Sequence, residues 1–203
     1  TLQMTSQTML LVTGRVDAVP VWEQHLDVWL PDALKALRFP EPTPLPFERG
    51  PWSGTSRNRR LTVLNRLMEG QHPLLPGQSS KLLVLTSARA LLQKTLPRRR
   101  FVSATRIVRT GQLLDLGKVV DGWQRVGYER VSTVETEGSF SIRGGILDIF
   151  PVGASIPARI ELFGDEVETL RAFDPATQRS DDLVDVGLSH ILIPPARELL
   201  PGD

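Results

Sequence analysis

The sequence predicts an α/β chain of two parts, a parallel α/β layer followed by a small β-rich α+β domain. In residues 1–103, unbroken apolar runs alternate with helical patterns, which is typical of a parallel sheet covered on both faces. In residues 104–193, most runs are short and alternate between apolar and polar residues, which is typical of antiparallel strands. We therefore expect a boundary near Ser103, and we expect residues 194–203, which open with two prolines, to be a linker.

The first part is expected to contain two buried strands, at 9–14 ("MLLVTG") and 81–87 ("KLLVLTS"). The helical patterns are "VWEQHLDVWLPDALKAL" at 21–37, interrupted at Pro31, "SRNRRLTVLNRLMEG" at 56–70, and "SARALLQKTLP" at 87–97, where Ser87 can cap the helix. Trp22 and Trp29 fall on the apolar stripe of the first helix and are expected in the core. The Pro-rich segment between the first two helices is expected to be a surface loop.

The second part begins with a predicted helix at 110–127, whose Leu113, Leu116, Val120 and Trp123 share one stripe. Strands are predicted at 128–135, 139–143, 145–151, 158–164 and 166–174, and a further apolar strand within 188–195. This pattern predicts a small antiparallel or mixed sheet covered by one helix.

Composition excludes several classes of function. With 24 basic and 23 acidic residues the net charge is +1, so any nucleic-acid contact has to be local. The absence of cysteine excludes disulfides, a thiol nucleophile and cysteine-ligated metal, and the three histidines have no metal-ligand spacing. No apolar run reaches the roughly 18 to 20 residues of a membrane span, and the N-terminus does not resemble a signal peptide. We expect a cytoplasmic protein.

Catalytic motifs are not evident. A phosphate loop would supply clustered N–H groups and a lysine, but the nearest lookalike, "GQSSK" at 77–81, has its lysine entering a strand instead of opening a helix. The only dense acidic group is Glu161, Asp165, Glu166 and Glu168. It could hold a divalent cation, but it is more simply interpreted as a solvated strand edge and hairpin turn. We expect no metal site and no enzyme activity in this chain.

Two arginine clusters are candidates for nucleic-acid contact. Arg57, Arg59 and Arg60 form one, and Arg98, Arg99 and Arg100 form the other. Each could follow a phosphate backbone, yet each also lies at a helix end or loop, where solvated arginines are common.

Phe163 breaks the polar pattern of its strand. In "ARIELFG" the side chains alternate, so Ile160 and Leu162 share one face while Arg159, Glu161 and Phe163 share the other. The same rule turns Arg143 outward. An aromatic residue flanked by arginines is typical of protein-binding hot spots. Alternatively, Phe163 packs under the Pro-rich turn at 151–157 or under the helix.

A family resemblance rests on three motifs within residues 127–180: "GSFSIRGGILDIFP" at 138–151, "PARIELFGDEVE" at 157–168 and "FDPATQRS" at 173–180. They resemble the domain shared by the bacterial transcription-repair coupling factors (Mfd) and the excision-repair helicase UvrB, and together they favour the coupling factors. Upstream, "LLVLTSARALLQKTLP" resembles more loosely the family's truncated, degenerate helicase-like (RecA-like) domain.

The resemblance implies an N-terminal UvrB-like module that recruits the damage-recognition protein UvrA to stalled RNA polymerase. The UvrA contacts of the family correspond here to Arg143, Arg159 and Phe163, with Glu161 a weaker candidate. No cofactor is implied for this chain; ATP and Mg²⁺ belong to the translocating motor of the full-length family member. RNA polymerase and double-stranded DNA are likewise bound by regions that this sequence does not match, so we interpret the chain as an N-terminal fragment.

Two other functions are weighed against UvrA docking. The first is a DNA-binding piece of a UvrB-type ATP-dependent helicase that uses the two arginine clusters, and the second is an independent hydrolase. Phosphate binding should weaken steeply with salt, whereas an interface anchored by Phe163 should keep a salt-resistant part. A hydrolase would require turnover by the chain itself.

Overall fold

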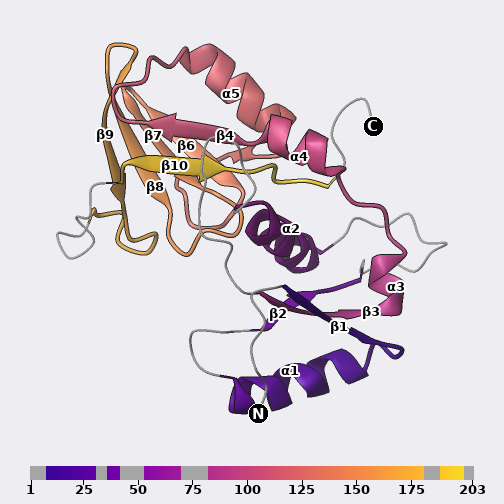
Figure 1. Cartoon of the computed structure of the whole chain (residues 1–203). Coiled ribbons are helices and arrows are strands. Elements are labelled where there is room, and N and C mark those ends of the chain that lie inside the picture. Colours follow the sequence, from indigo (N-terminus) through magenta and orange to yellow (C-terminus); the bar gives the residue numbers. More distant parts are fainter. Residues whose placement is uncertain (1–7, 31–35, 42–52, 70–81, 181–187, 199–203) are drawn as a thin grey trace. The chain divides into compact units, whose positions relative to one another are not determined.

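The computed structural model describes residues 8–30, 36–41, 53–69, 82–180 and 188–198, and it divides the chain into two compact units, Thr1–Thr95 and Leu96–Asp203 (Figure 1). The division falls between Thr95 and Leu96, whereas the sequence predicts a boundary near Ser103. The fold class expected from the sequence is confirmed: a parallel three-stranded sheet with helices is followed by a β-rich unit with a mixed sheet. No helix in the described ranges is long and apolar enough to cross a membrane.

The first unit is built on a parallel sheet in the order β1-β3-β2, with β1 at Met9–Thr13, β2 at Ala36–Phe39 and β3 at Leu83–Ser87. The helices are α1 (Ala18–Trp29), α2 (Gly54–Glu69) and the short α3 (Ala88–Leu91). Helices α1 and α2 lie on opposite faces of the sheet (Figure 1). Every residue of the central β3 is buried, as its unbroken apolar run predicts.

Two predictions for this unit are wrong. Ala36 and Leu37 were expected to end a helix, and Arg38 and Phe39 to open the Pro-rich loop, but Ala36–Phe39 forms β2: it pairs in parallel with β3, and Thr86 Oγ1 donates a hydrogen bond to Phe39 O at 2.8 Å. Trp22 and Trp29, expected in the core, are 47% and 83% exposed. The less exposed stripe of α1 is a neighbouring one, whose residues recur at helical intervals: Val19, Glu23, Leu26 and Leu30.

The last predicted helix of this unit is shorter than expected. Ser87 does cap it, since its side chain accepts a hydrogen bond from Ala90 N at 3.1 Å, but the helix ends at Leu91. Most of the predicted Pro-rich loop and the lookalike "GQSSK" lie outside the described residues.

The second unit contains a five-stranded sheet in the order β5-β6-β7-β8-β9. The strands are β5 (Glu129–Arg130), β6 (Ser139–Arg143), β7 (Ile146–Phe150), β8 (Ala158–Phe163) and β9 (Glu166–Ala172). β5 pairs with β6 in parallel, and the other pairs are antiparallel. A separate antiparallel pair joins β4 (Arg106–Arg109) to β10 (His190–Ile193), and the helices are α4 (Arg98–Ala104) and α5 (Leu116–Arg125).

One apolar core of this unit lies on the face of the five-stranded sheet that contacts Trp123, and a second buried cluster, Val134, Phe150 and Phe173, lies on the side of Asp148. Trp123 of α5 is 2% exposed, as expected, and its ring meets Phe140 edge-on with centroids 5.3 Å apart. Leu147, Ile149 and Ile160 are fully buried. These apolar positions of the predicted alternation form one face of the sheet, and the other face carries polar side chains together with the buried cluster of Val134, Phe150 and Phe173.

The predicted helix at 110–127 begins later than expected. Asp115 caps α5 by accepting a hydrogen bond from Lys118 N at 3.1 Å, so the helix starts at Leu116. Leu113 therefore does not share the helical stripe: it forms a β-bridge with Glu166 and is 75% exposed. Of the strand predicted at 128–135, only Glu129–Arg130 pairs, and neither α4 nor β4 was predicted.

The segment expected to open a linker is described as far as Glu198. Ala196 is 2% exposed and its N–H bonds to Val126 O at 2.9 Å, while Arg197 Nη2 donates to Gln124 O at 3.0 Å. These five residues, 194–198, are therefore packed on the second unit.

Tyr128 joins three parts of this unit. Its hydroxyl donates to Pro194 O at 2.9 Å and accepts a longer bond from Val152 N at 3.4 Å, and the side chain is 3% exposed. Burial raises the pKa of the phenol, the bond from Val152 opposes the rise, and the nearby charge of Glu137 adds to it.

We predict that Tyr128 keeps its proton until the domain unfolds. The free phenol ionises at a pKa of about 10, so above this pH the unfolded chain loses a proton that the folded chain retains, and the free energy of unfolding falls as pH rises. Because Tyr128 is the only tyrosine, phenolate absorbance reports it alone. It should appear together with the loss of circular dichroism, and in denaturant it should appear near pH 10. Phenolate formed near pH 10 in a chain that is still folded would contradict this.

Candidate protein-binding face

The four residues singled out by strand alternation lie on the face of the five-stranded sheet opposite the core. Arg159, Glu161 and Phe163 come from β8, and Arg143 ends β6. Phe163 is 79% exposed. On the opposite face of the same strand, Ile160 is fully buried and Leu162 is partly buried. We call Arg143, Arg159, Glu161 and Phe163 the docking face. The exposure of Phe163 decides against packing under a turn or helix.

Strand register arranges this side of the sheet in three rows. The first contains Ser141, Asp148, Arg159 and Arg171, and the second contains Arg143, Ile146, Glu161 and Thr169. The third contains Phe163 and Glu166. Residues that oppose one another across antiparallel strands project to the same side, so each row presents its side chains together.

Asp148 organises the arginines. It is fully buried and directly opposite Arg159. Its Oδ1 accepts from Arg159 Nε at 2.7 Å, and its Oδ2 accepts from Arg159 Nη2 at 3.0 Å and from Arg143 Nη2 at 2.7 Å. One carboxylate thus holds two guanidinium groups, which offsets the cost of burying its charge.

The two arginines differ in how freely they reach solvent. The side chain of Arg159 is only 14% exposed; its Nη2 also donates to Gln178 O at 3.3 Å, and its guanidinium lies 4.9 Å from the ring centroid of Phe173. The hydrogen bond to Asp148 raises the pKa of Arg159, although burial opposes the rise. The side chain of Arg143 is 53% exposed. Arg143 is therefore the more available cation, and Arg159 is a fixed one.

Glu161 lies in the row of Arg143, between the row of Arg159 and the row of Phe163. Its Oε2 accepts a hydrogen bond from Thr169 Oγ1 at 2.7 Å, directly across the β8–β9 ladder. After Phe163 the chain turns back through Gly164, whose φ of +62° is in the left-handed region that glycine favours. This two-residue turn holds Phe163 at the end of the sheet.

Sequence reasoning missed Asp148. The signal was present, because "ILDIF" places Asp148 on the side opposite Leu147 and Ile149. An isolated acid in an apolar strand, between two strands that carry arginines, is a candidate partner for them. The alternation rule alone could not reveal that one carboxylate serves both arginines.

The arginine clusters proposed for DNA contact differ in accessibility. Arg60 is fully buried in α2: its Nη1 donates to Pro40 O at 2.9 Å, and its guanidinium lies 4.0 Å from the ring centroid of Phe39. A phosphate therefore cannot reach Arg60 in this structure. Arg57 is half-buried and Arg59 is exposed, while Arg98, Arg99 and Arg100 of α4 are all exposed. The two clusters belong to different units.

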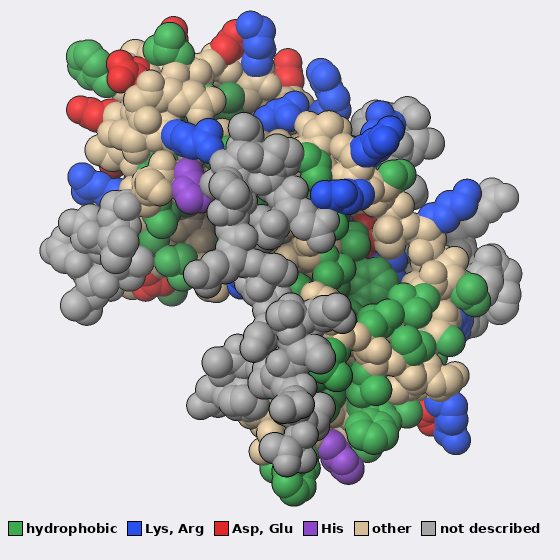
Figure 2. Space-filling model, in the orientation of Figure 1, with side chains coloured by type: hydrophobic (Ala, Val, Ile, Leu, Met, Phe, Trp, Pro, Cys, Tyr) green, Lys and Arg blue, Asp and Glu red, His purple; other side chains and the backbone are tan. Residues whose placement is uncertain are grey.

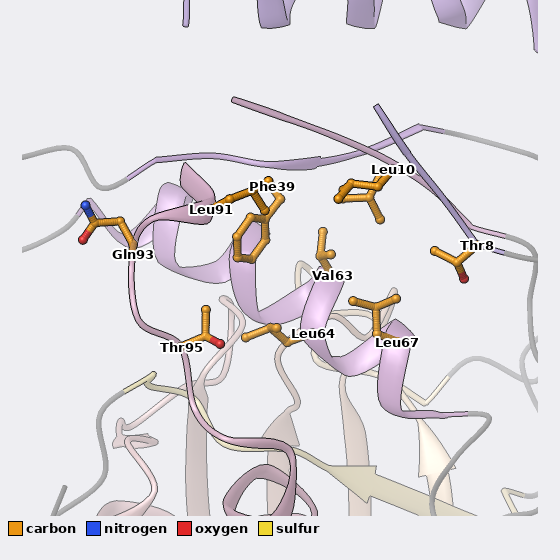
Figure 3. A pocket seen from close by; sticks show the side chains of 10 residues that line it. Thr8, Leu10, Phe39, Val63, Leu64, Leu67, Leu91, Gln93 and Thr95 are labelled. Atoms are coloured by element: carbon orange, nitrogen blue, oxygen red, sulfur yellow. The ribbon is translucent and has the colours of Figure 1, made fainter. Parts of the chain in front are cut away.

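The first unit offers a hollow but little chemistry. Its volume is about 350 Å³, and it lies between α2 and the sheet, lined largely by apolar side chains such as Leu10, Phe39, Val63 and Leu67 (Figure 3). The polar lining residues are Thr8, Gln93 and Thr95, none of which is an acid or a base at neutral pH. Within the described ranges, no group of three or more His, Cys, Asp or Glu is arranged to hold a metal ion.

Comparison with known proteins gives the family. A family model described as the UvrB interaction domain matches residues 107–199. The chain is 36% identical over 171 residues to the transcription-repair-coupling factor of Myxococcus xanthus and 35% identical over 144 residues to that of Bacillus subtilis, covering 84% and 71% of the present chain. Our chain is homologous to the region of the transcription-repair-coupling factors that contains a UvrB interaction domain. This confirms the resemblance carried by the motifs.

The match to the coupling factors extends beyond the UvrB interaction domain. The factor of Staphylococcus aureus strain USA300 is 30% identical over 181 residues, or 89% of this chain. The chain spans only 11 to 15% of the length of these relatives. A UvrB interaction domain implies a protein partner, and the docking face lies within the matched residues.

We predict that Asp148→Asn lowers the free energy of unfolding by about 3 kcal/mol, because it removes the carboxylate that is directly bonded to the largely buried Arg159. The measurement is urea unfolding followed by circular dichroism. Glu161→Gln is the matched control: it removes the charge of a partly exposed carboxylate and should cost less than about 1 kcal/mol. Equal losses in the two variants would mean that Asp148 does not organise the face.

Proposed function

We propose that this chain is a protein-binding module of a transcription-repair-coupling factor, and that it recruits UvrA to stalled RNA polymerase through the docking face. The observation that carries the proposal is the 79% exposure of Phe163 on the sheet face that also carries Arg143 and Arg159, within a domain of the UvrB interaction type. An exposed aromatic ring on a rigid strand loses little side-chain entropy on binding. Arginine and aromatic residues also concentrate binding energy at protein interfaces.

The docking face suits a partner that carries carboxylates and an apolar pocket. In the first two rows of this face, the three arginines Arg143, Arg159 and Arg171 outnumber the carboxylates of Asp148 and Glu161, so one net positive charge remains. Carboxylates of UvrA would pair with Arg143, whose side chain is half-exposed, while Phe163 fills the pocket. Binding to RNA polymerase and DNA, and ATP-driven translocation with Mg²⁺, belong in this proposal to other regions of the full-length protein.

We predict that Phe163→Ala weakens UvrA binding about thirtyfold, the size expected for loss of a central anchor worth about 2 kcal/mol. Arg143→Ala should weaken it about tenfold. Calorimetric titration of purified UvrA into the chain measures both. Arg159→Glu is a poorer choice, because it would set a second carboxylate against the buried Asp148 and disturb folding.

The matched control is Ile156→Ala. Ile156 is 43% exposed and lies just before β8, at the end of that strand opposite Phe163. It should leave the affinity unchanged. If the parent chain does not bind UvrA, or if Phe163→Ala binds as well as the parent, the docking assignment is wrong.

A second candidate function, DNA binding, is favoured by one observation: Arg98, Arg99 and Arg100 are all exposed in the first turn of α4. Affinity that depends on phosphate contacts should fall linearly in log salt, and replacing these three arginines by alanine should reduce that slope. UvrA binding anchored by Phe163 should retain a salt-resistant part.

A further inference from the structure

A short segment before α5 extends the β8–β9 hairpin by one more pairing. Gly111 N donates to Val167 O at 2.8 Å, Val167 N donates to Gln112 O at 2.9 Å, and Leu114 N donates to Asp165 O at 2.7 Å. These bonds hold Leu113 directly opposite Glu166. The backbone hydrogen bonds lie on either side of Leu113 and Glu166, which are therefore a non-hydrogen-bonded pair. In an antiparallel ladder, this kind of pair brings opposed side chains closest together.

Leu113 therefore completes the third row of the sheet. Glu166 faces Phe163 on one side and Leu113 on the other, so the three side chains project from the same face. We call Phe163, Glu166 and Leu113 the hairpin row. Phe163 is 79% exposed and Leu113 is 75% exposed. Two large apolar side chains thus flank one carboxylate at the end of the docking face.

Leu113 is not a core residue. Its neighbour Leu114 is 6% exposed and supplies the apolar contact to the core, while backbone bonds fix the segment. Single exposed apolar residues are common on protein surfaces. A leucine and a phenylalanine fixed in one cross-strand row are a different case, because together they form a rigid apolar patch beside the arginines.

The charge at this end is opposite to that near the arginines. Asp165, Glu166 and Glu168 are all exposed, and within the described part of the chain no ion pair engages them. Figure 2 shows hydrophobic and acidic side chains gathered at the upper left, where Figure 1 has the β8–β9 hairpin. The sheet face therefore runs from a basic row with Arg159 and Arg171 to an acidic, apolar hairpin row.

We infer that Leu113 and Phe163 are paired anchors of one interface, and that Glu166 between them pairs with a cation of the partner. This inference rests on the proposed function and specifies the partner's surface. UvrA would present an apolar hollow rimmed by lysine or arginine opposite the hairpin row, and carboxylates opposite the arginines. A surface that is basic at one end and acidic at the other fixes the orientation of the partner, because a reversed complex would place like charges opposite each other.

The test is calorimetric titration of UvrA into the parent chain, Leu113→Ala, Glu166→Lys and Phe163→Ala. Leu113→Ala should weaken binding about tenfold, since it truncates an anchor at the interface. Glu166→Lys should weaken binding by at least as much, and its effect should shrink as salt is raised. Circular dichroism should be unchanged, because both side chains are largely exposed.

Two matched controls keep the outcome specific. Ile156→Ala truncates a partly exposed apolar side chain at the other end of β8, and Glu129→Lys reverses an exposed charge on β5, at the opposite edge of the sheet. Neither should change the affinity. A loss caused equally by Glu129→Lys would reflect overall charge and would overturn the role of Glu166.

The outcomes separate this inference from the proposed function. If Phe163→Ala loses affinity while Leu113→Ala binds like the parent, UvrA docking stands and the hairpin row is not a paired anchor. If all variants bind like the parent, or if the parent does not bind, the proposed function fails and the inference fails with it. Loss in both Leu113→Ala and Phe163→Ala, with intact controls, supports the inference.

Discussion

The carboxylate of Asp148 is the constraint on which the polar face of the second sheet depends. A fully buried charge requires partners, and this one receives three hydrogen bonds from Arg143 and Arg159. The arginines are in turn held at fixed positions on β6 and β8. Two side chains that would lose entropy on binding a partner are therefore already ordered in the free protein, which reduces the cost of association.

The packed side chains on the opposite face of the same strands hold the sheet in place. Trp123 packs edge-on against Phe140, and the buried Tyr128 hydroxyl links β10's continuation at Pro194 to the loop that holds Val152. The sheet can thus present Phe163 to solvent at one end while the Trp123 face and the cluster of Val134, Phe150 and Phe173 stay buried. The two faces of the sheet differ because successive side chains of each strand point to opposite sides.

The first unit has a different character. Its buried Arg60 is stacked on Phe39 and bonded to a backbone carbonyl, so a residue type usually associated with phosphate binding is here part of the interior. The hollow beside α2 is lined by apolar side chains with only threonine and glutamine as polar groups. Among the described residues, the first unit also exposes Trp22 and Trp29, whereas the combination of an exposed aromatic residue with arginines on one sheet face lies on the second unit.

The sequence by itself determined the parallel and β-rich parts, most strands, and the side of the sheet to which Arg143, Arg159, Glu161 and Phe163 belong. Strand alternation is local, so a short window is enough to read it. Which stripe of α1 is buried, whether Ala36–Phe39 is a strand, and where α5 begins were decided by tertiary contacts. Helical stripes one residue apart are nearly equivalent in sequence, and strand pairing can override helical propensity.

The composition of the binding face likewise needed the tertiary structure. Asp148, Arg143 and Arg159 come from three different strands and meet through hydrogen bonds. Leu113 shares a row with Phe163 only because it pairs with Glu166, which lies some fifty residues further along the chain. Neighbours of this kind are set by strand order and register. The sequence therefore determined which residues face outward, and the fold determined which of them act together.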